Sequence, residues 1–315
     1  MFEITKYSPQ QANEWNAFVK QSKQGTFLFD RHYMDYHSDR FDDFSLIVRR
    51  KQRIFALLPA NLAGNTLYSH QGLTYGGLLT NAKATTSDVC EIFRHILSFL
   101  SEHGIHRFVY KAVPHIYHRI PAEEDLYALV NVCNAHIITR HISSTIALEN
   151  RMKFAESRKS GIRKAIRNGI IVEESNDLAA FWHILNDNLH NKYDATPVHS
   201  LAELTLLKSL FSKEIRLFIA QSSEKLPIGG TIVYETPRTI HTQYISASPE
   251  GKANGALDLL FDHILNKVYA SHTGYFDFGK SSDGDGHDLN EQLIFQKEGF
   301  GGRGICYDTW EISDF

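Results

Sequence analysis

The residues best suited to bind an anion lie in the segment 246–256, which reads Ser-Ala-Ser-Pro-Glu-Gly-Lys-Ala-Asn-Gly-Ala. A run with strand-like alternation precedes this segment, and a run with apolar residues at helical spacing follows it. Backbone N–H groups at a helix N-terminus attract phosphate, and glycines allow close approach. The pattern therefore predicts a loop that cradles a carrier's pyrophosphate, or else an ordinary helix N-cap without a ligand. We assign the cradle to Gly251, Lys252, Asn254, Gly255 and Ala256.

Side chains able to accept a proton occur on the strands around this loop. His241 and Tyr244 lie in the strand before it, and Asp277 stands between two phenylalanines in a later strand. Each of them also fits a structural role, and water can remove a proton instead. The sequence therefore identifies no general base, and we count Tyr244 among the candidate substrate-binding residues.

A basic stretch follows the middle of the chain, from Arg158 to Arg167. At helical spacing Arg163 and Arg167 share one face. Such a face is usually solvated, but a substrate that carries phosphates would need charges of this kind. Arg163 is accordingly a candidate substrate contact.

The first half of the chain offers a contrasting glycine-rich loop at residues 72–77. The next helix begins many residues later, with Thr86 or Ser87 as its cap and Glu91 in its first turns. Because an acidic helix start disfavours pyrophosphate, we expect no carrier site here. Tyr75 and Gly76 are expected to shape an acceptor pocket, the alternative being a glycine-rich strand end with a buried tyrosine.

Composition limits the class of protein. The chain has 315 residues, enough for two domains, and its 43% hydrophobic and 22% charged content is typical of globular proteins. A net charge of −3 gives no broad basic surface for nucleic acid or for an anionic membrane. We therefore expect no DNA partner.

Cysteine and histidine usage argues against a disulfide framework and a metal site. The three cysteines are scattered without a CxxC motif, and the 17 histidines include no HExxH. The first residues show no signal peptide, and no apolar run is long enough to span a bilayer. We expect a cytoplasmic protein with no transmembrane segment and no metal.

Both halves show the order helix, three strands, helix, strand, helix, strand, although an α/β chain without duplication also permits this division. An apolar strand gives way to a charged helix near Glu149, so we expect domains at 1–149 and 150–315. The expected helices are 10–22, 87–104, 123–132, 154–169, 177–193, 201–212, 257–269 and 289–299. The expected strands are 44–50, 54–63, 66–78, 107–113, 136–148, 215–222, 229–235, 239–248, 275–281 and 305–313.

This order, with a glycine loop after three antiparallel strands, resembles the GNAT acyltransferase fold. Two such units in tandem resemble the FemAB-like branch, which includes the peptidoglycan aminoacyltransferases. Three passages carry the resemblance: the basic helix 160–170, the segment 246–261, and Phe-Asp-Phe-Gly at 276–279 followed by Leu-Asn at 289–290 and Phe-Gln-Lys-Glu-Gly-Phe-Gly at 295–301. The resemblance implies an α/β fold with a mixed sheet, built from two tandem GNAT-like (acyl-CoA N-acyltransferase) domains.

The resemblance also implies that Lys297 stabilises the oxyanion of an acyl-transfer intermediate. A cation between Phe295 and Phe300 would be poorly solvated, so its charge would act strongly. The alternative is a surface lysine paired with Glu298 or Glu291.

We therefore expect a transferase that moves an acyl or aminoacyl group onto an amine of an envelope precursor or other small acceptor. The donor, acyl-CoA such as acetyl-CoA or aminoacyl-tRNA, stays open, because the glycine spacing only approximates that of acetyl-CoA users. The second domain is expected to bind this co-substrate and the first the acceptor, with no permanently bound cofactor; tRNA would be a partner in the second case. The alternative is a non-catalytic tandem-GNAT binding or assembly protein.

Overall fold

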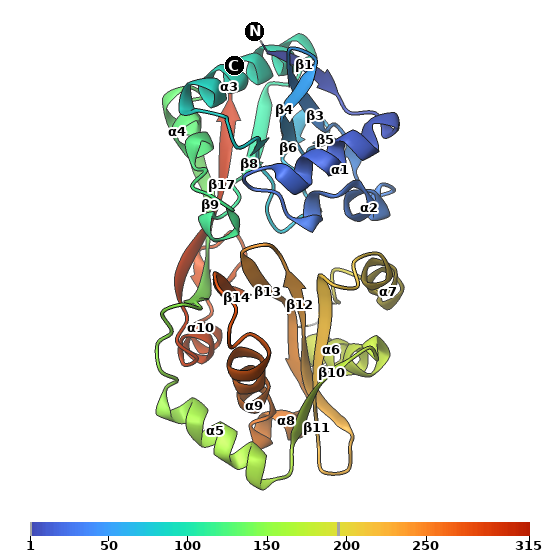
Figure 1. Ribbon diagram of the computed structural model, residues 1–315, viewed down its shortest axis with the longest axis vertical. Helices are drawn as coiled ribbons and strands as arrows, with labels where there is room; N and C mark the ends of the chain where they lie inside the picture. Colours follow the sequence, from blue (N-terminus) through green and yellow to red (C-terminus); the bar gives the residue numbers. More distant parts are fainter. Residues whose placement is uncertain (1, 194–195) are drawn as a thin grey trace. The chain divides into compact units, whose positions relative to one another are not determined.

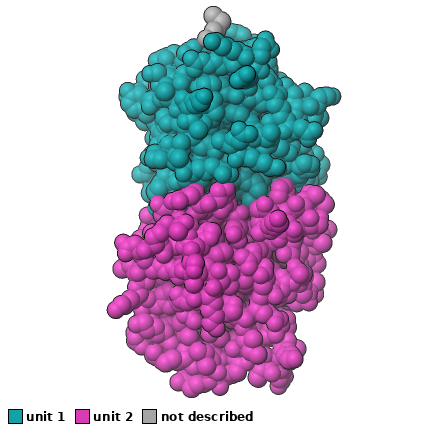
Figure 2. Space-filling model, in the orientation of Figure 1, with its two compact units in different colours: residues 1–142, 282–288, 305–315 teal, residues 143–281, 289–304 magenta. Residues whose placement is uncertain are grey.

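The computed structural model describes residues 2–193 and 196–315. They form an α/β structure that divides into two compact units, coloured separately in Figure 2. Unit 1 comprises the residues up to Ile142 together with 282–288 and 305–315, and unit 2 comprises 143–281 and 289–304. The chain first passes between the units within one strand, a few residues before Glu149. None of the helices in the described residues is long and apolar enough to cross a membrane.

The described residues of unit 1 contribute to three sheets: one with the strand order β1-β3-β4-β7, one with the order β9-β17-β8-β6-β5-β2, and a two-stranded sheet of β15 (Ser282–Asp283) with the start of β16 (Asp288–Leu289). Its helices are α1 (Ala12–Gln21), α2 (Arg31–Met34), α3 (Thr86–Glu102) and α4 (Glu124–Asn131). Its strands are β1 (Glu3–Lys6), β2 (Asp42–Asp43), β3 (Leu46–Arg50), β4 (Arg53–Leu58), β5 (Asn61–Ala63), β6 (Thr66–Tyr68), β7 (Leu79–Thr80), β8 (Arg107–Lys111), the first part of β9 (His136–Ala147) and most of β17 (Arg303–Ser313).

The core of unit 1 forms under α3, whose apolar face carries Ile92, Phe93 and Ile96. The last strand, β17, pairs antiparallel with β8 and adds Ile312 to this core. The cap of α3 is Thr85, in a capping box with Asp88, and not Thr86 or Ser87 with Glu91. The acidic start expected for this helix is nonetheless present.

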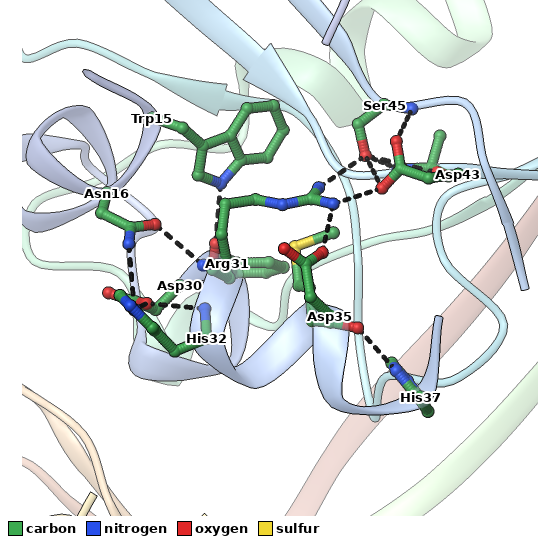
Figure 3. A network of polar contacts seen from close by, with 12 residues as sticks. Trp15, Asn16, Asp30, Arg31, His32, Asp35, His37, Asp43 and Ser45 are labelled. Carbon is green, nitrogen blue, oxygen red and sulfur yellow. Dashed lines mark hydrogen bonds and ion pairs between the residues drawn. The ribbon is translucent and has the colours of Figure 1, made fainter. Parts of the chain in front are cut away.

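A buried arginine ties together the first elements of unit 1, as Figure 3 shows. The Arg31 guanidinium donates to Asp35 and, at 2.6 Å, to Asp43 Oδ2, and it lies 3.9 Å from the centre of the Tyr7 ring. Burial opposes the charge on Arg31, but the two carboxylates outweigh it and raise its pKa. This network explains how a 4%-exposed cation is tolerated there.

Unit 2 is built on a mixed sheet with the order β10-β11-β12-β13-β14-β9. Helix α9 packs on one face of this sheet and α6 on the other, with α5 beside α9 (Figure 1). The helices are α5 (Glu156–Arg167), α6 (Leu178–Tyr193), α7 (Leu201–Leu210), α8 (Pro249–Asn254), α9 (Ala256–His263) with a π-helical extension (Ile264–Val268), and α10 (Glu291–Glu298). The strands are β10 (Ile171–Ser175), β11 (Ile215–Gln221), β12 (Pro227–Glu235), β13 (Thr239–Ala247), β14 (Tyr275–Lys280) and the end of β9.

The core of unit 2 fills the space between α9 and the sheet. Phe276 and Phe278 of β14 contact Phe261 of α9, and Phe278 stacks on Phe300. Because side chains alternate along a strand, Asp277 between them points to the opposite face of the sheet. The Phe-Asp-Phe sequence thus places two aromatic rings in the core and one carboxylate on the other side.

Candidate functional site

The candidate site begins where strands β13 and β14 separate. Their parallel ladder joins only 239–241 to 275–277, although β13 continues to Ala247 and β14 to Lys280. Two irregularities lie at this point, one opposite Gln243 in the β12–β13 pairing and one between Asp277 and Lys280 in the β14–β9 pairing. Strand edges that leave a ladder offer backbone groups to a ligand, and bulges often lie beside active sites.

Buried polar atoms with no hydrogen-bond partner among the described residues lie on β13 and on β9, the two strands that flank β14. Thr242 is 4% exposed, and its Oγ1 has no hydrogen-bond partner among the described residues. The same holds there for Gln243 Oε1 on β13 and for Ser144 Oγ on β9. Buried polar atoms are rarely left unsatisfied in a native protein, so these three atoms indicate contact with a ligand or water.

Asp277 is the centre of a hydrogen-bonded cluster on the opposite face of the sheet. Its Oδ2 lies 2.8 Å from His241 Nδ1, while its Oδ1 accepts from Ser143 Oγ and, at 2.7 Å, from Thr145 Oγ1. Complete burial raises the pKa of Asp277, but the hydrogen bonds and charge of His241 and the two hydroxyls outweigh this and lower it to about 2. Asp277 is therefore a carboxylate at neutral pH.

Gly279 fits between this cluster and the next helix. Its φ of +73° is in the left-handed region, and a Cβ there would lie 3.3 Å from His241 Cε1. Its carbonyl oxygen accepts a hydrogen bond from Lys297 at 2.8 Å. The glycine of the Phe-Asp-Phe-Gly motif is thus required by both its backbone angle and the space beside the imidazole.

Lys297 of α10 is buried, with 5% of the residue exposed. Its ammonium donates to Gly279 O and Lys280 O at 2.8 Å and to Ser281 Oγ at 2.9 Å. Burial lowers the pKa of Lys297 to about 8, and the charge of Asp277 opposes this. The interpretation as a surface lysine paired with a glutamate does not hold.

The segment expected to form an open phosphate loop is mostly helix α8. Ser248 caps it by accepting from Gly251 N, and Gly255 at its C-terminus donates its N–H to Gly251 O. Lys252 Nζ donates to Asn188 Oδ1, and Asn254 Oδ1 accepts from Asn168 at 2.9 Å. The N–H groups of both glycines expected to cradle a phosphate are therefore used inside the protein, and Ala256 is fully buried.

The glycines of this region instead allow two helices to pack closely. Gly255 has φ +75°, and a Cβ on it would lie 2.5 Å from the carbonyl oxygen of Gly161 in α5. Arg158 of α5 forms an ion pair at 2.8 Å with Asp258 of α9 nearby. The basic helix and the glycine segment, two of the passages that carry the resemblance, therefore form one α5–α9 interface.

Known structures share this fold across nearly the whole chain. FemX matches with a TM-score of 0.67 at 10% identity, covering 97% of this chain and 96% of that chain. L-PGS from Bacillus licheniformis matches with a TM-score of 0.61 at 12% identity, covering 98% and 92%. A tandem GNAT protein from the clavulanic acid biosynthesis pathway matches with a TM-score of 0.51 at 11% identity, covering 99% and 98%.

The chain has the tandem GNAT, FemAB-like fold. At these identities the likeness establishes the fold alone. No protein-family model and no curated protein matches the sequence. The matches to known structures confirm the expected mixed α/β fold with two GNAT-like units.

The other candidate residues of the second GNAT-like unit lie on two different elements. Tyr244 on β13 accepts from His199 N at 3.3 Å, its hydroxyl lies 2.7 Å from His199 Nδ1, and its ring contacts Trp182 of α6. Burial raises its pKa. Arg163 is exposed on α5 and pairs with Glu156 at 2.7 Å. Tyr244 therefore contacts His199 and α6, whereas Arg163 lies on the exposed face of α5.

The candidates of the first GNAT-like unit are buried. Tyr75 is 1% exposed, donates to Thr26 Oγ1 at 3.2 Å and packs on Phe29 and Tyr117. A Cβ on Gly76 would overlap the backbone of Ser69. This is the buried tyrosine at a glycine-rich strand end that the sequence offered as the second interpretation.

Ser143 and Thr145 are site residues that the sequence did not indicate, and the same is true of Ser144 and Thr242. Ser143 and Thr145 lie two apart on β9, so both face the side of the sheet that Asp277 occupies. The spacing was visible in the sequence, but the pairing of β9 with β14 was not.

Proposed function

We propose that this protein is an acyl- or aminoacyltransferase that moves an acyl group from a carrier to an amine, with the donor held by unit 2. The single observation that carries the proposal is the separation of β13 from β14 beside Thr242 Oγ1, Gln243 Oε1 and Ser144 Oγ, which have no partner in the described protein. An extended acyl arm with amide or ester groups could pair with a free strand edge and with these side chains.

Lys297 supplies the positive charge in this proposal. Attack of an amine on the acyl carbonyl produces an oxyanion, which a poorly solvated ammonium stabilises strongly. Its three hydrogen bonds anchor the end of β14, so binding an oxyanion would require exchange of one of them, most simply the Ser281 hydroxyl. The acceptor in this proposal is an amine of an envelope precursor or of another small molecule.

Two donors remain in this proposal. The fold is shared with FemX and with a tandem GNAT protein described as lacking AcCoA, so acyl-CoA and aminoacyl-tRNA are both carried forward. The residues fit the acyl arm of either donor better than a pyrophosphate, because the N–H groups of Gly251 and Gly255 already have partners. A carrier whose phosphates bind elsewhere, for example on the basic face of α5, agrees best with this geometry.

The N–H groups of Gly251 and Gly255 already have partners in the protein, and this also supports a second candidate function. A chain that keeps the tandem fold as a non-catalytic binding or assembly module would need no open phosphate cradle. This alternative predicts neither donor consumption nor an effect of Lys297 on any rate.

The test is consumption of the donor by the purified protein. Acetyl-CoA, longer acyl-CoAs and a set of aminoacyl-tRNAs would be incubated with the protein and a panel of amines, and thiol release or deacylation measured. The same donors would be screened by thermal unfolding, since a ligand at 100 times its Kd adds about 2.7 kcal/mol. The proposal requires turnover of at least one donor. Stabilisation by a donor without turnover would favour the binding module, and absence of both would refute the transferase.

Lys297→Met tests the role of the charge, because it removes the ammonium group and keeps an unbranched side chain. We expect kcat to fall by about 100- to 1000-fold with KM for the donor little changed, because the ammonium acts on the transition state. Lys213→Met, an exposed position of unit 2 outside α5, is the control for loss of one lysine. An unchanged kcat in Lys297→Met would remove Lys297 from the reaction.

A further inference from the structure

We propose that the exposed side of helix α5 docks unit 2 onto an anionic lipid surface. The basic face of α5 is formed by Lys159, Arg163, Lys164 and Arg167. These cations gather on one side of a helix whose other side is buried in the protein. Docking through this face goes beyond the transferase function and does not require it.

The packing of α5 on α9 determines which side of the helix faces solvent. Ala165 is fully buried, and a Cβ on Gly161 would overlap the carboxylate of Asp258 on α9. At about 3.6 residues per turn, the basic face, centred on Arg163 and Arg167, lies on the opposite side of the helix. Figure 1 shows α5 at the edge of unit 2, with α9 on its inner side. The cations are therefore presented to whatever adjoins unit 2 at this edge.

The charge of this face is positive, although the whole chain has a net charge of −3. Glu156 is the only carboxylate between positions 153 and 170, and it lies 2.7 Å from Arg163 and 3.6 Å from Lys159. Lys164 and Arg167 form no ion pair within the described part of the chain. Helices that carry roughly four to eight Lys and Arg residues are attracted to anionic headgroups. The face is thus complementary to a negatively charged surface.

Exposed apolar side chains favour a lipid surface over a nucleic acid as the partner. Ile166 of α5 is 60% exposed, and Met152 before the helix and Ile171 after it are 49% and 54% exposed. Such side chains gain free energy at the boundary between headgroups and acyl chains, whereas a phosphate backbone offers them no apolar surroundings. Sites for single-stranded nucleic acid use aromatic side chains for stacking, and the sequence has none between 156 and 167.

The attraction would be electrostatic and reversible. Each cation that reaches an anionic surface raises the partition coefficient about five-fold at low ionic strength. Salt screens this attraction, because the Debye length falls from about 30 Å at 0.01 M to about 10 Å at 0.1 M. Binding through α5 should therefore require anionic lipid and weaken as salt is added.

Sedimentation of the full chain with lipid vesicles tests the proposal. One set of vesicles contains phosphatidylcholine alone, and the other contains equal parts of phosphatidylcholine and phosphatidylglycerol. The test variant is Lys164→Gln with Arg167→Gln, which removes two exposed charges from α5. The matched control is Lys213→Gln with Lys225→Gln, which removes two exposed charges elsewhere in unit 2. Ile166→Ser tests the apolar contribution at constant charge.

We expect the wild type to sediment with the anionic vesicles at low ionic strength and not with phosphatidylcholine alone. The double variant of α5 should lower the partition coefficient about 20-fold, and the control pair by less than about 3-fold. Ile166→Ser should lower it by about 3- to 10-fold, since part of one apolar side chain no longer enters the lipid. All three variants should unfold at nearly the wild-type temperature, because the substituted side chains are exposed.

Three results would overturn lipid docking by α5. The first is a wild type that stays in solution with anionic vesicles at low ionic strength. The second is an equal loss in the two double variants, which would mean that net charge and not this face causes binding. The third is an Ile166→Ser variant that binds the vesicles as the wild type does. A tRNA that binds the wild type through Lys164 and Arg167, while the vesicles do not bind, would assign the face to nucleic-acid phosphates instead.

Discussion

At the scale of single residues, a few buried polar atoms with no hydrogen-bond partner among the described residues support the proposed donor site. Thr242 and Thr231 are a matched pair for testing this, since both are buried threonines on adjacent strands of unit 2. Thr231 Oγ1 donates to Tyr244 O at 2.8 Å, whereas Thr242 Oγ1 has no hydrogen-bond partner in the described part of the chain.

We predict that Thr242→Val leaves the free energy of unfolding unchanged or raises it by up to about 1 kcal/mol, while Thr231→Val lowers it by about 1 kcal/mol. The reason is that only Thr231 loses a hydrogen bond. Urea unfolding of both variants without ligand measures the difference. Equal losses would mean that Thr242 bonds within the protein, which would remove the main support for the donor site.

Burial of Lys297 also predicts how stability depends on pH. The pKa of this lysine is about 8 in the folded protein and about 10.4 in an unfolded chain. Between these values the unfolded chain binds more protons, so the free energy of unfolding rises as the pH increases from 8 to 10.4. Lys297→Met lacks this contribution.

We therefore predict that the stability of the wild type relative to Lys297→Met rises by about 3 kcal/mol over that pH range. Denaturant titrations at pH 7.5 and 10.5 measure it, with Lys213→Met as the surface control. A difference that stays flat would show that the ammonium is hydrated in solution.

At the scale of elements, the region resembling a phosphate loop is better explained as a helix pair in close contact. Gly255 is left-handed, and a side chain there would meet the carbonyl of Gly161. Gly169 is also left-handed, with φ +68°, but a Cβ on it would lie 3.3 Å from Ser223 Cβ and 3.9 Å from Ser223 Cα, without overlap. The two glycines therefore share the backbone angle and differ in packing.

We predict that Gly169→Ala costs about 1 kcal/mol and Gly255→Ala about 3 kcal/mol, because only the second adds an overlap with the α5 backbone. Urea unfolding monitored by the near-ultraviolet signal of unit 2 aromatics would compare them. If the two costs are equal, α5 does not pack against Gly255 as described.

Element identity could be predicted from the sequence where the pattern is local. The apolar periodicity of α3 and the alternation of β11 and β13 are properties of consecutive residues, and those elements lie close to their expected bounds. Helix α8 was taken for a loop because of its glycines, although Ser248 followed by Pro249 is a helix-start signal. The Asp277–His241 contact could not be predicted, since it depends on the register of two strands that alternation alone does not determine.

At the scale of the whole molecule, the chain does not divide into two continuous halves. The strand β17 lies at the end of the sequence, but from residue 305 onward it belongs to unit 1, where Ile312 is fully buried beside α3. A sequence boundary near Glu149 assigns this strand to the second unit, because strand partners far apart in the sequence leave no local signal.

We predict that Ile312→Ala destabilises unit 1 by about 2–5 kcal/mol. Hydrogen exchange should show loss of protection in α3 and β8, with α9 and β11 retaining theirs. Leu260→Ala, a fully buried residue of α9, is the matched variant for unit 2 and should show the opposite pattern. Loss of protection in α9 and β11 on Ile312→Ala would contradict this assignment of the last strand.

The central claim is that unit 2 holds an acyl donor where β13 leaves β14. Hydrogen exchange of the full chain, with and without acetyl-CoA or an aminoacyl-tRNA, tests it most directly. We predict that the donor slows exchange at residues 242–247 and 278–280, with the loop 72–77 unchanged. Protection of the 72–77 loop alone, or of neither segment by any donor that binds, would contradict the account.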